Sequence, residues 1–135
     1  MANIEEVEGI GPVYGEKLSA AGVKTTDDLL MAGAKPSGRA NLEAATGIAH
    51  SLILEWVNHV DLMRIKGVGS EYSDLLEAAG VDSPAELSHR NAANLAETFQ
   101  EVVAARPGIV RRVPSQSEIE DWIGQSKGLD KVVEH

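Results

Sequence analysis

A repeat at one constant spacing constrains this chain more than any other feature of its sequence. The segment Val7–Tyr14, with the sequence VEGIGPVY, returns 58 positions later as Ile65–Tyr72, with the sequence IKGVGSEY. The likeness continues from Leu18–Val23 into Leu76–Val81, and nine identical residues fall at this one offset. Because chance rarely aligns so many residues at a single spacing, we expect the chain to contain an internal duplication.

Each copy places a Gly-hydrophobic-Gly tripeptide directly before a segment with helical periodicity. We call Gly9–Gly11 the first glycine turn and Gly67–Gly69 the second glycine turn. Glycine permits a sharp bend and a close approach of the backbone to another group. The first N–H groups of the helix that follows lack carbonyl partners within that helix. Such a position favours contact with an anion such as phosphate.

Helix signals recur along the chain, and no segment alternates as a strand would, so we expect an all-α protein. The hairpin helices are predicted over residues 12–21 and 70–79, each ended by a glycine, Gly22 or Gly80. The next helices are opened by Thr25 in the first copy and by the Ser83–Glu86 capping box in the second. Apolar stripes around Trp56 and Trp122 predict further core helices.

The repeat predicts two units packed into one compact helical body, the first over residues 1–60 and the second over 61–126. The Trp56 and Trp122 segments are 66 residues apart rather than 58, so the second copy carries eight extra residues. We place these in an expanded loop near residues 106–114, where proline and glycine interrupt the helical pattern. Residues 127–135 lack caps and periodicity and are expected to form a flexible tail.

Composition excludes several classes of chemistry. The chain has no cysteine, which removes disulfides, thiolate nucleophiles and Cys-ligated zinc. No metal-ligand spacing relates the four histidines, so we expect no metal and no cofactor. No serine or carboxylate lies in a catalytic arrangement, and we expect no enzymatic activity. No apolar run is long enough for a membrane span and the N-terminal segment is acidic, so the cytoplasm is the expected location.

The two glycine turns and the helices around them resemble the helix-hairpin-helix superfamily. In that pattern Ile4 and Val7 precede the first turn, and Leu62 and Ile65 precede the second. Most of the chain before the tail is also similar to the uncharacterised domain-of-unknown-function family 4332. That likeness is carried by segments 61–69, 72–81 and 111–122. The resemblance implies a tandem helix-hairpin-helix fold and brings no established activity with it.

The helix-hairpin-helix resemblance implies weak, salt-sensitive contact with the backbone of duplex DNA, independent of base sequence. Backbone amides of the two turns would hold phosphates, and nearby basic side chains would assist. The candidate residues in the first copy are Gly9, Ile10, Gly11 and Lys17. Those in the second copy are Arg64, Lys66, Gly67, Val68, Gly69, Arg111 and Arg112.

A second hypothesis is a protein-interaction adaptor that has lost its DNA contacts. DNA-binding turns of this kind usually carry Lys or Arg two residues after the second glycine, where this chain has Val13 and Glu71. The formal net charge of −9 also runs against the basic balance that DNA binders need. An acidic adaptor would favour a basic or apolar partner surface, and the sequence leaves the oligomeric state open.

Overall fold

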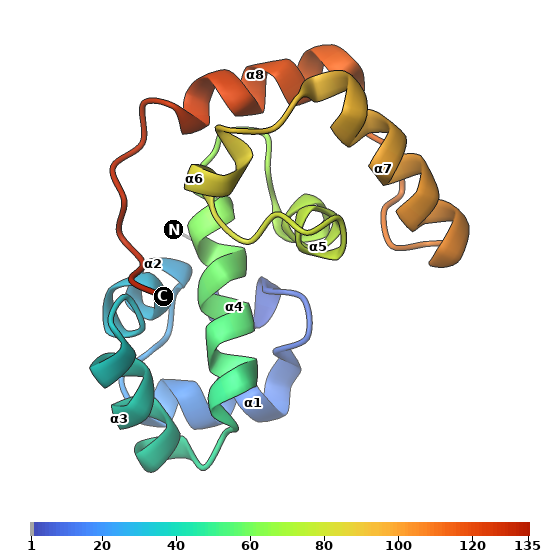
Figure 1. The fold of residues 1–135 in the computed structure, drawn as a ribbon. Coiled ribbons are helices and arrows are strands. Elements are labelled where there is room, and N and C mark those ends of the chain that lie inside the picture. The colour runs from blue at the N-terminus through green and yellow to red at the C-terminus, as the bar shows by residue number, and fades with distance from the viewer. Residues whose placement is uncertain (1) are drawn as a thin grey trace. The chain divides into compact units, whose positions relative to one another are not determined.

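The computed structural model describes residues 2–135, and throughout this range the regular structure is helical (Figure 1). The elements are the 3₁₀ helix η1 (Ile4–Glu6) and the α-helices α1 (Gly11–Ala20), α2 (Thr26–Ala32), α3 (Pro36–Thr46), α4 (His50–Leu62), α5 (Ser70–Ala78), α6 (Pro84–Leu87), α7 (Ala92–Ala105) and α8 (Gln116–Ser126). Extended pairing among these residues is limited to one isolated bridge between Asn3 and Thr25. The prediction of an all-α fold is confirmed. None of the helices described is long and apolar enough to cross a membrane.

The chain forms two compact units. Unit 1 comprises residues up to Asp61 together with Val132–His135, and unit 2 comprises Leu62–Lys131. The two meet along the chain within the last turn of α4. The sequence-based division into residues 1–60 and 61–126 stays a prediction, as does the mobility of residues 127–135. In the structure the end of that segment has defined contacts, because Val133 is buried within unit 1.

Unit 1 is built around the first glycine turn, which lies between η1 and α1. Helix α1 packs against η1 and α3, and α3 packs against α2. Helix α2 begins as predicted at a Thr25 cap: the Thr25 hydroxyl accepts from the Asp28 N–H, and the Asp28 carboxylate accepts from the Thr25 N–H. The core comprises Ile4, Val7, Ile10, Leu18, Val23, Leu29, Leu42, Ile48, Ile53, Trp56, Val57, Val60 and Val133.

Unit 2 is built around the second glycine turn, which leads into α5. Helix α8 packs against α6 and α7, and α7 packs against α5. Its core comprises Leu62, Ile65, Val68, Leu75, Leu76, Val81, Leu87, Leu95, Phe99, Val110, Ile119, Trp122 and Ile123. The predicted apolar stripe of α8 is therefore buried. In α7, Leu95 and Phe99 are buried, whereas Val102 and Val103 are only partly buried.

The cap of α6 differs from its predicted form. The Ser83 hydroxyl accepts from the Glu86 N–H at 3.1 Å, as expected. The Glu86 carboxylate, however, accepts from Arg90 one turn further along rather than from the Ser83 backbone. The sequence pattern for a reciprocal capping box therefore gives a one-sided cap, because an arginine at i+4 competes for the carboxylate.

Candidate functional site

Both glycine turns bring glycine backbone to the surface. Gly9, Gly67 and Gly69 are exposed, whereas the apolar residues between the glycines, Ile10 and Val68, are 3% and 4% exposed. The middle side chain therefore anchors each turn in the core of its own unit, and the glycines face solvent. The helix that follows, α1 or α5, begins at this surface with N–H groups that have no acceptor within the helix.

Each turn is supported from behind by a buried tryptophan. Trp56 packs with Tyr14 in unit 1 at a ring-centroid distance of 5.1 Å, and Trp122 packs with Tyr72 in unit 2 at 5.2 Å. A Cβ on Gly67 would lie 3.0 Å from the Trp122 Nε1, and Gly67 has a φ of +96°. Both the backbone conformation and the close indole therefore require glycine at this position.

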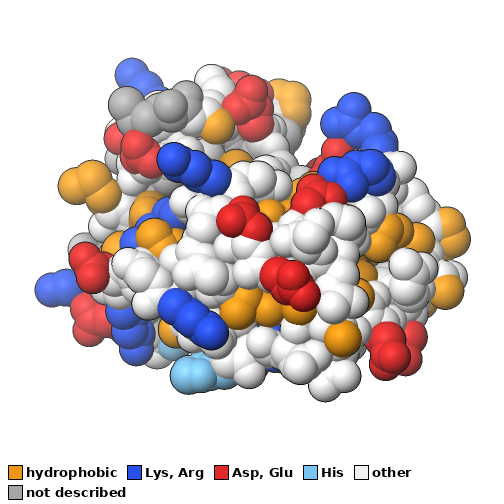
Figure 2. Space-filling model, turned by 90° about the horizontal axis from the view of Figure 1, so that it is seen from above, with side chains coloured by type: hydrophobic (Ala, Val, Ile, Leu, Met, Phe, Trp, Pro, Cys, Tyr) orange, Lys and Arg blue, Asp and Glu red, His pale blue; other side chains and the backbone are white. Residues whose placement is uncertain are grey.

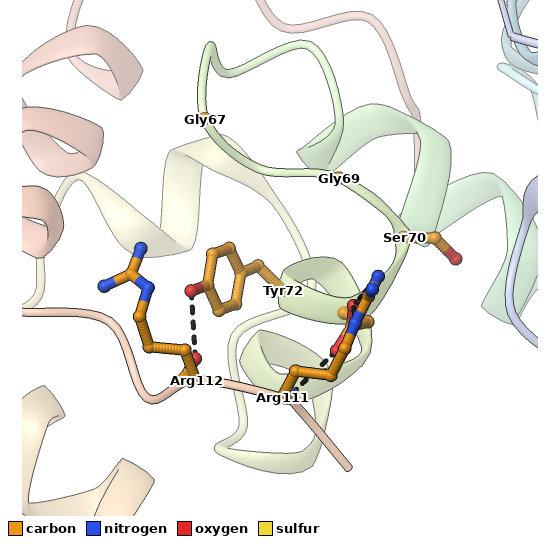
Figure 3. Close-up of a pocket in the computed structure, with 7 residues that line it drawn as sticks. Gly67, Gly69, Ser70, Tyr72, Arg111 and Arg112 are labelled. Carbon is orange, nitrogen blue, oxygen red and sulfur yellow. Dashed lines mark hydrogen bonds and ion pairs between the residues drawn. The ribbon is translucent and has the colours of Figure 1, made fainter.

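The loop of unit 2 between α7 and α8 carries two exposed arginines to the second glycine turn. It begins after α7 with a bend at Gly108, where φ is +87°. Val110 is 8% exposed and Pro114 is also buried, so the loop is anchored in the core on both sides of Arg111 and Arg112. The side chains of Arg111 and Arg112 are exposed and project from the loop (Figure 3).

These arginines help to line a cavity of about 440 Å³ whose other walls are Gly67, Gly69, Ser70, Glu71 and Tyr72. Figure 3 shows Arg111 and Arg112 projecting from the loop on opposite sides of Tyr72. The Tyr72 hydroxyl donates to the Arg112 carbonyl at 2.9 Å, which ties α5 to the loop. The cavity thus combines glycine backbone, the start of α5 and two cationic groups from one unit.

Arg111 is held by Glu71, in the first turn of α5. The Glu71 carboxylate accepts from the Arg111 backbone N–H at 2.9 Å and from its guanidinium Nη2 at 2.8 Å. These hydrogen bonds and the guanidinium charge lower the pKa of Glu71 and raise that of Arg111. The Arg111 side chain nevertheless remains 93% exposed. It is accessible to an anion that replaces the carboxylate.

Arg112 makes a two-pronged contact with Glu118 in the first turn of α8. Nη1 and Nη2 donate to the two carboxylate oxygens at 2.7 and 2.9 Å. The same carboxylate accepts from the Ser115 backbone N–H, so it caps α8 as well. The Arg112 hydrogen bond and then the Ser115 bond lower the pKa of Glu118 to about 2. We call this Arg112–Glu118 pair the clasp.

The remaining predicted residues lie outside the cavity lining. Lys17 belongs to unit 1, where its Nζ lies 6.0 Å from the centre of the Tyr14 ring. Arg64 donates to the Asp130 carbonyl at 3.0 Å. The Lys66 side chain is exposed, and the Gln125 side chain bonds both the Lys66 N–H and its carbonyl. Gly9, Ile10 and Gly11 form the corresponding turn of unit 1.

Sequence reasoning missed the partners of the two loop arginines. The Ser-x-x-Glu spacing of Ser115 and Glu118 signals a helix start. It gives no sign that Arg112 would share the carboxylate, and no pattern connects Glu71 with Arg111 across 40 residues. On the face drawn in Figure 2, Lys and Arg side chains are interspersed with Asp and Glu.

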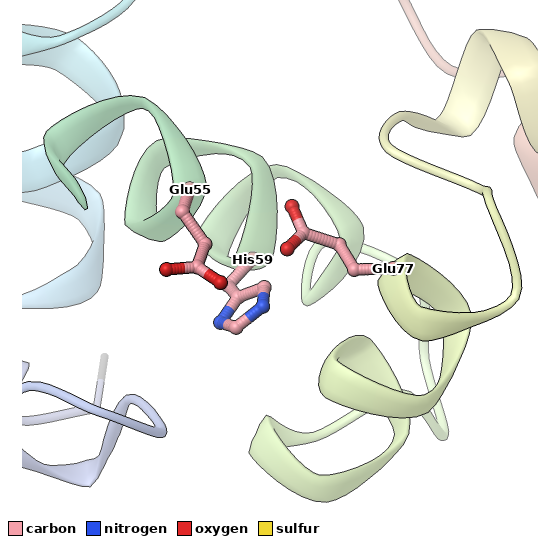
Figure 4. Close-up of side chains that lie close together, drawn as sticks. All are labelled: Glu55, His59 and Glu77. Carbon is pink, nitrogen blue, oxygen red and sulfur yellow. The ribbon is translucent and has the colours of Figure 1, made fainter. Parts of the chain in front are cut away.

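One further pair of ionisable groups was also missed. Glu55 and His59 lie one turn apart on α4 (Figure 4). Glu55 is exposed and His59 is 2% exposed. The histidine spacings considered in the sequence do not include this carboxylate–imidazole pair.

Most of the chain matches the model of one known protein family. Residues 8–129 match the model of the domain of unknown function DUF4332. The chain belongs to this family. The match extends from the first glycine turn through α8, so it includes the cavity at the second glycine turn. Among curated proteins and solved structures, none matches the chain.

Proposed function

We propose that this DUF4332 protein is a non-catalytic binding module of the tandem helix-hairpin-helix type, with the cytoplasm as its expected location. Its second glycine turn contacts the phosphate backbone of duplex DNA, independently of base sequence. The observation that carries the proposal is the pair of exposed arginines, Arg111 and Arg112, beside the glycines that precede α5.

The loop supplies the positive charge that the start of the helix lacks. Glu71 stands where DNA-binding turns usually carry Lys or Arg, and on sequence alone it repels phosphate. Arg111 lies 2.8 Å from that carboxylate and brings a guanidinium to the same place. A phosphate then competes with Glu71 for Arg111 and with Glu118 for Arg112. This competition supports weak binding that falls steeply with salt.

The distribution of charge supports unit 2 as the DNA-contacting unit. Unit 2 has eight Lys or Arg and eleven Asp or Glu, a net charge of −3. Unit 1 has four Lys or Arg and ten Asp or Glu, a net charge of −6. Long-range repulsion of a polyanion is therefore smaller at unit 2, and the local arginines act against a lower background.

Fluorescence anisotropy with a labelled duplex at several low salt concentrations tests this function. The double variant Arg111→Ala/Arg112→Ala should bind more weakly. Its negative slope of log K against log salt should become shallower by about two. Glu71→Gln should bind more tightly, because it removes a competing charge and keeps an acceptor for the loop N–H. The wild-type chain failing to bind at tens of micromolar would exclude the proposed function.

Arg106→Ala is the matched control. Arg106 belongs to the same loop and is also exposed, but it pairs with Asp74 at 3.5 Å and does not line the cavity. Arg106→Ala removes one positive charge and the double variant removes two, so a general electrostatic effect would weaken binding by the same amount per charge removed. We expect Arg106→Ala to leave the salt slope within about 0.3 of wild type. An equal loss per charge in Arg106→Ala and in the double variant would argue against the cavity as the contact.

A second candidate function, a protein-interaction adaptor, is favoured by unit 1. Val13, at the position where a basic residue would sit, is 68% exposed. Met31 on α2 is 80% exposed. Exposed apolar side chains in a unit of net charge −6 suit a partner surface that is basic with apolar patches.

A pull-down from nuclease-treated native extract tests the adaptor. Val13→Gln/Met31→Gln should reduce the recovery of a direct partner severalfold, because it removes the exposed apolar contacts. Arg111→Ala/Arg112→Ala should leave this recovery unchanged. If every recovered protein disappears on nuclease treatment, the adaptor function is excluded and the nucleic-acid function is favoured.

A further inference from the structure

The segment Val132–His135 is bound in unit 1 by hydrogen bonds to its own main chain. The Glu134 N–H donates to the Ala34 carbonyl at 2.7 Å. The Glu134 carbonyl accepts from the Arg39 Nη2 at 2.8 Å. The segment has no helix of its own, so these bonds replace the local ones that a helix would provide.

Arg39 is the centre of this contact. It lies on α3, is 2% exposed, and donates through Nη1 to the Gly33 and Ala34 carbonyls at 2.8 and 3.3 Å. Its charge is therefore buried against carbonyl oxygens. Burying a guanidinium is costly unless its N–H groups are satisfied, and the Glu134 carbonyl satisfies the Nη2 group. Without the segment, that group would lose its partner.

Side chains add selectivity to the backbone contacts. Val133 is 1% exposed, whereas its neighbours Val132 and Glu134 are half-buried and exposed. The His135 Nε2 lies 2.9 Å from the Asn58 Oδ1. One aliphatic side chain therefore enters the core, and a histidine at the second position after it meets an amide. Two successive residues of an extended segment point to opposite sides, which explains why only one valine is buried.

We propose that unit 1 contains a binding site for an extended peptide, organised by the Arg39 guanidinium, and that residues 132–135 are its intramolecular ligand. The site recognises main-chain N–H and carbonyl groups through Ala34 and Arg39, an aliphatic residue through the core, and a histidine through Asn58. The chain reaches the site only after passing through all of unit 2. Residues 132–135 thus return to unit 1 and occupy this site.

Amide hydrogen exchange in the full chain tests the proposal. The Glu134 N–H should be protected on the order of tenfold or more relative to the exposed Lys131. Val133→Asp should abolish this protection, since a carboxylate cannot occupy the core position without a partner. The matched variant Val132→Asp should retain it. Rapid exchange of the wild-type Glu134 N–H, or equal effects of the two variants, would overturn the proposal.

A peptide added in trans separates a binding site from a merely destabilised unit. The peptide has the sequence of residues 129–135, LDKVVEH, and is added at millimolar concentration to the full-length Val133→Asp chain. The wild-type peptide should shift the amide resonances of Ala34, Arg39 and Asn58, and the peptide with aspartate at position 133 should leave them in place. No shift with the wild-type peptide, or the same shift with both, would contradict the proposal.

Discussion

The two glycine turns of this protein have the same support and different surroundings. In both, an apolar residue between the glycines is buried, and a tyrosine–tryptophan pair packs in the same unit with ring centroids 5.1 or 5.2 Å apart. At the surface, the first turn is followed by an exposed Val13, and the second by Glu71 bound to Arg111. Packing restricts the internal residues of a repeat, whereas the exposed residues are free to differ.

The loop between α7 and α8 accounts for much of the difference in charge around the two turns. It is anchored by Val110 and Pro114 and covers residues 106–115, whereas residues 47–49 alone connect α3 to α4 in unit 1. Arg111 and Arg112, on this loop, place positive charge beside the second turn. These two residues lie outside the repeated sequence segments. The two turns therefore share the same support and differ in the charges that surround them. We expect the first turn to be the weaker contact for an anion.

The largest expected effect concerns the support behind the turns. Gly67→Ala should reduce the free energy of unfolding by about 2–3 kcal/mol, because a Cβ meets the Trp122 indole at a positive φ. Gly9→Ala should cost about 1–2 kcal/mol, since the corresponding Trp56 distance is 3.4 Å rather than 3.0 Å. Urea unfolding followed by tryptophan fluorescence measures both.

Gly69→Ala is the control within the second turn. Its φ is −97°, and a Cβ there would have no atom within 4 Å. We expect a change within about 0.5 kcal/mol. If Gly69→Ala destabilised the protein as much as Gly67→Ala, the cost would come from general stiffening of the turn and not from the tryptophan. A larger effect at Gly9 than at Gly67 would reverse the comparison.

A smaller effect concerns the clasp and its pH dependence. The folded-state pKa of Glu118 is about 2, below the ordinary 4.5. Its contribution to stability is therefore complete above pH 4.5 and is lost as the pH falls towards 2. In Arg112→Ala the Glu118 pKa should rise towards 4.5, while Ser115 still holds it below that value. Carbon-detected NMR titration of the carboxyl group measures the shift.

Asp28 in unit 1 serves as the internal reference for that titration. Its pKa is lowered chiefly by the hydrogen bond from the Lys24 backbone N–H, and it caps α2 without an arginine. Arg112→Ala should leave the Asp28 titration unchanged. A shift of Asp28 equal to that of Glu118 would point to a global change in the fold, and an unshifted Glu118 would show that Ser115 alone sets its pKa.

The helices and their ends were largely predictable because their signals are local. The caps at Thr25 and Ser83 and the glycines after α1 and α5 act within a few residues of each helix end. Apolar periodicity likewise identified the buried faces of α4 and α8 around Trp56 and Trp122. The exposed glycines and buried middle residues of the two turns agree with the predicted bends.

The candidate site was predictable only in its parts. The turn residues and the two loop arginines were named from the sequence, but their pairing with Glu71 and Glu118 was not. Glu71 and Arg111 are 40 residues apart, and loop closure over that distance depends on where Val110 and Pro114 are buried. The same holds for Arg39 and Glu134, which are 95 residues apart. No short pattern reports such contacts.

By itself the sequence determined the helical class and the positions of the two glycine turns, since these follow from local propensity and from an internal repeat. The tertiary structure alone decided the partners of the arginines: Arg111 with Glu71, Arg112 with Glu118, and the buried Arg39 with the Glu134 carbonyl. The physical reason is that side-chain pairing depends on the packing of residues distant in the chain, and a repeat preserves packing more strictly than it preserves surface charge.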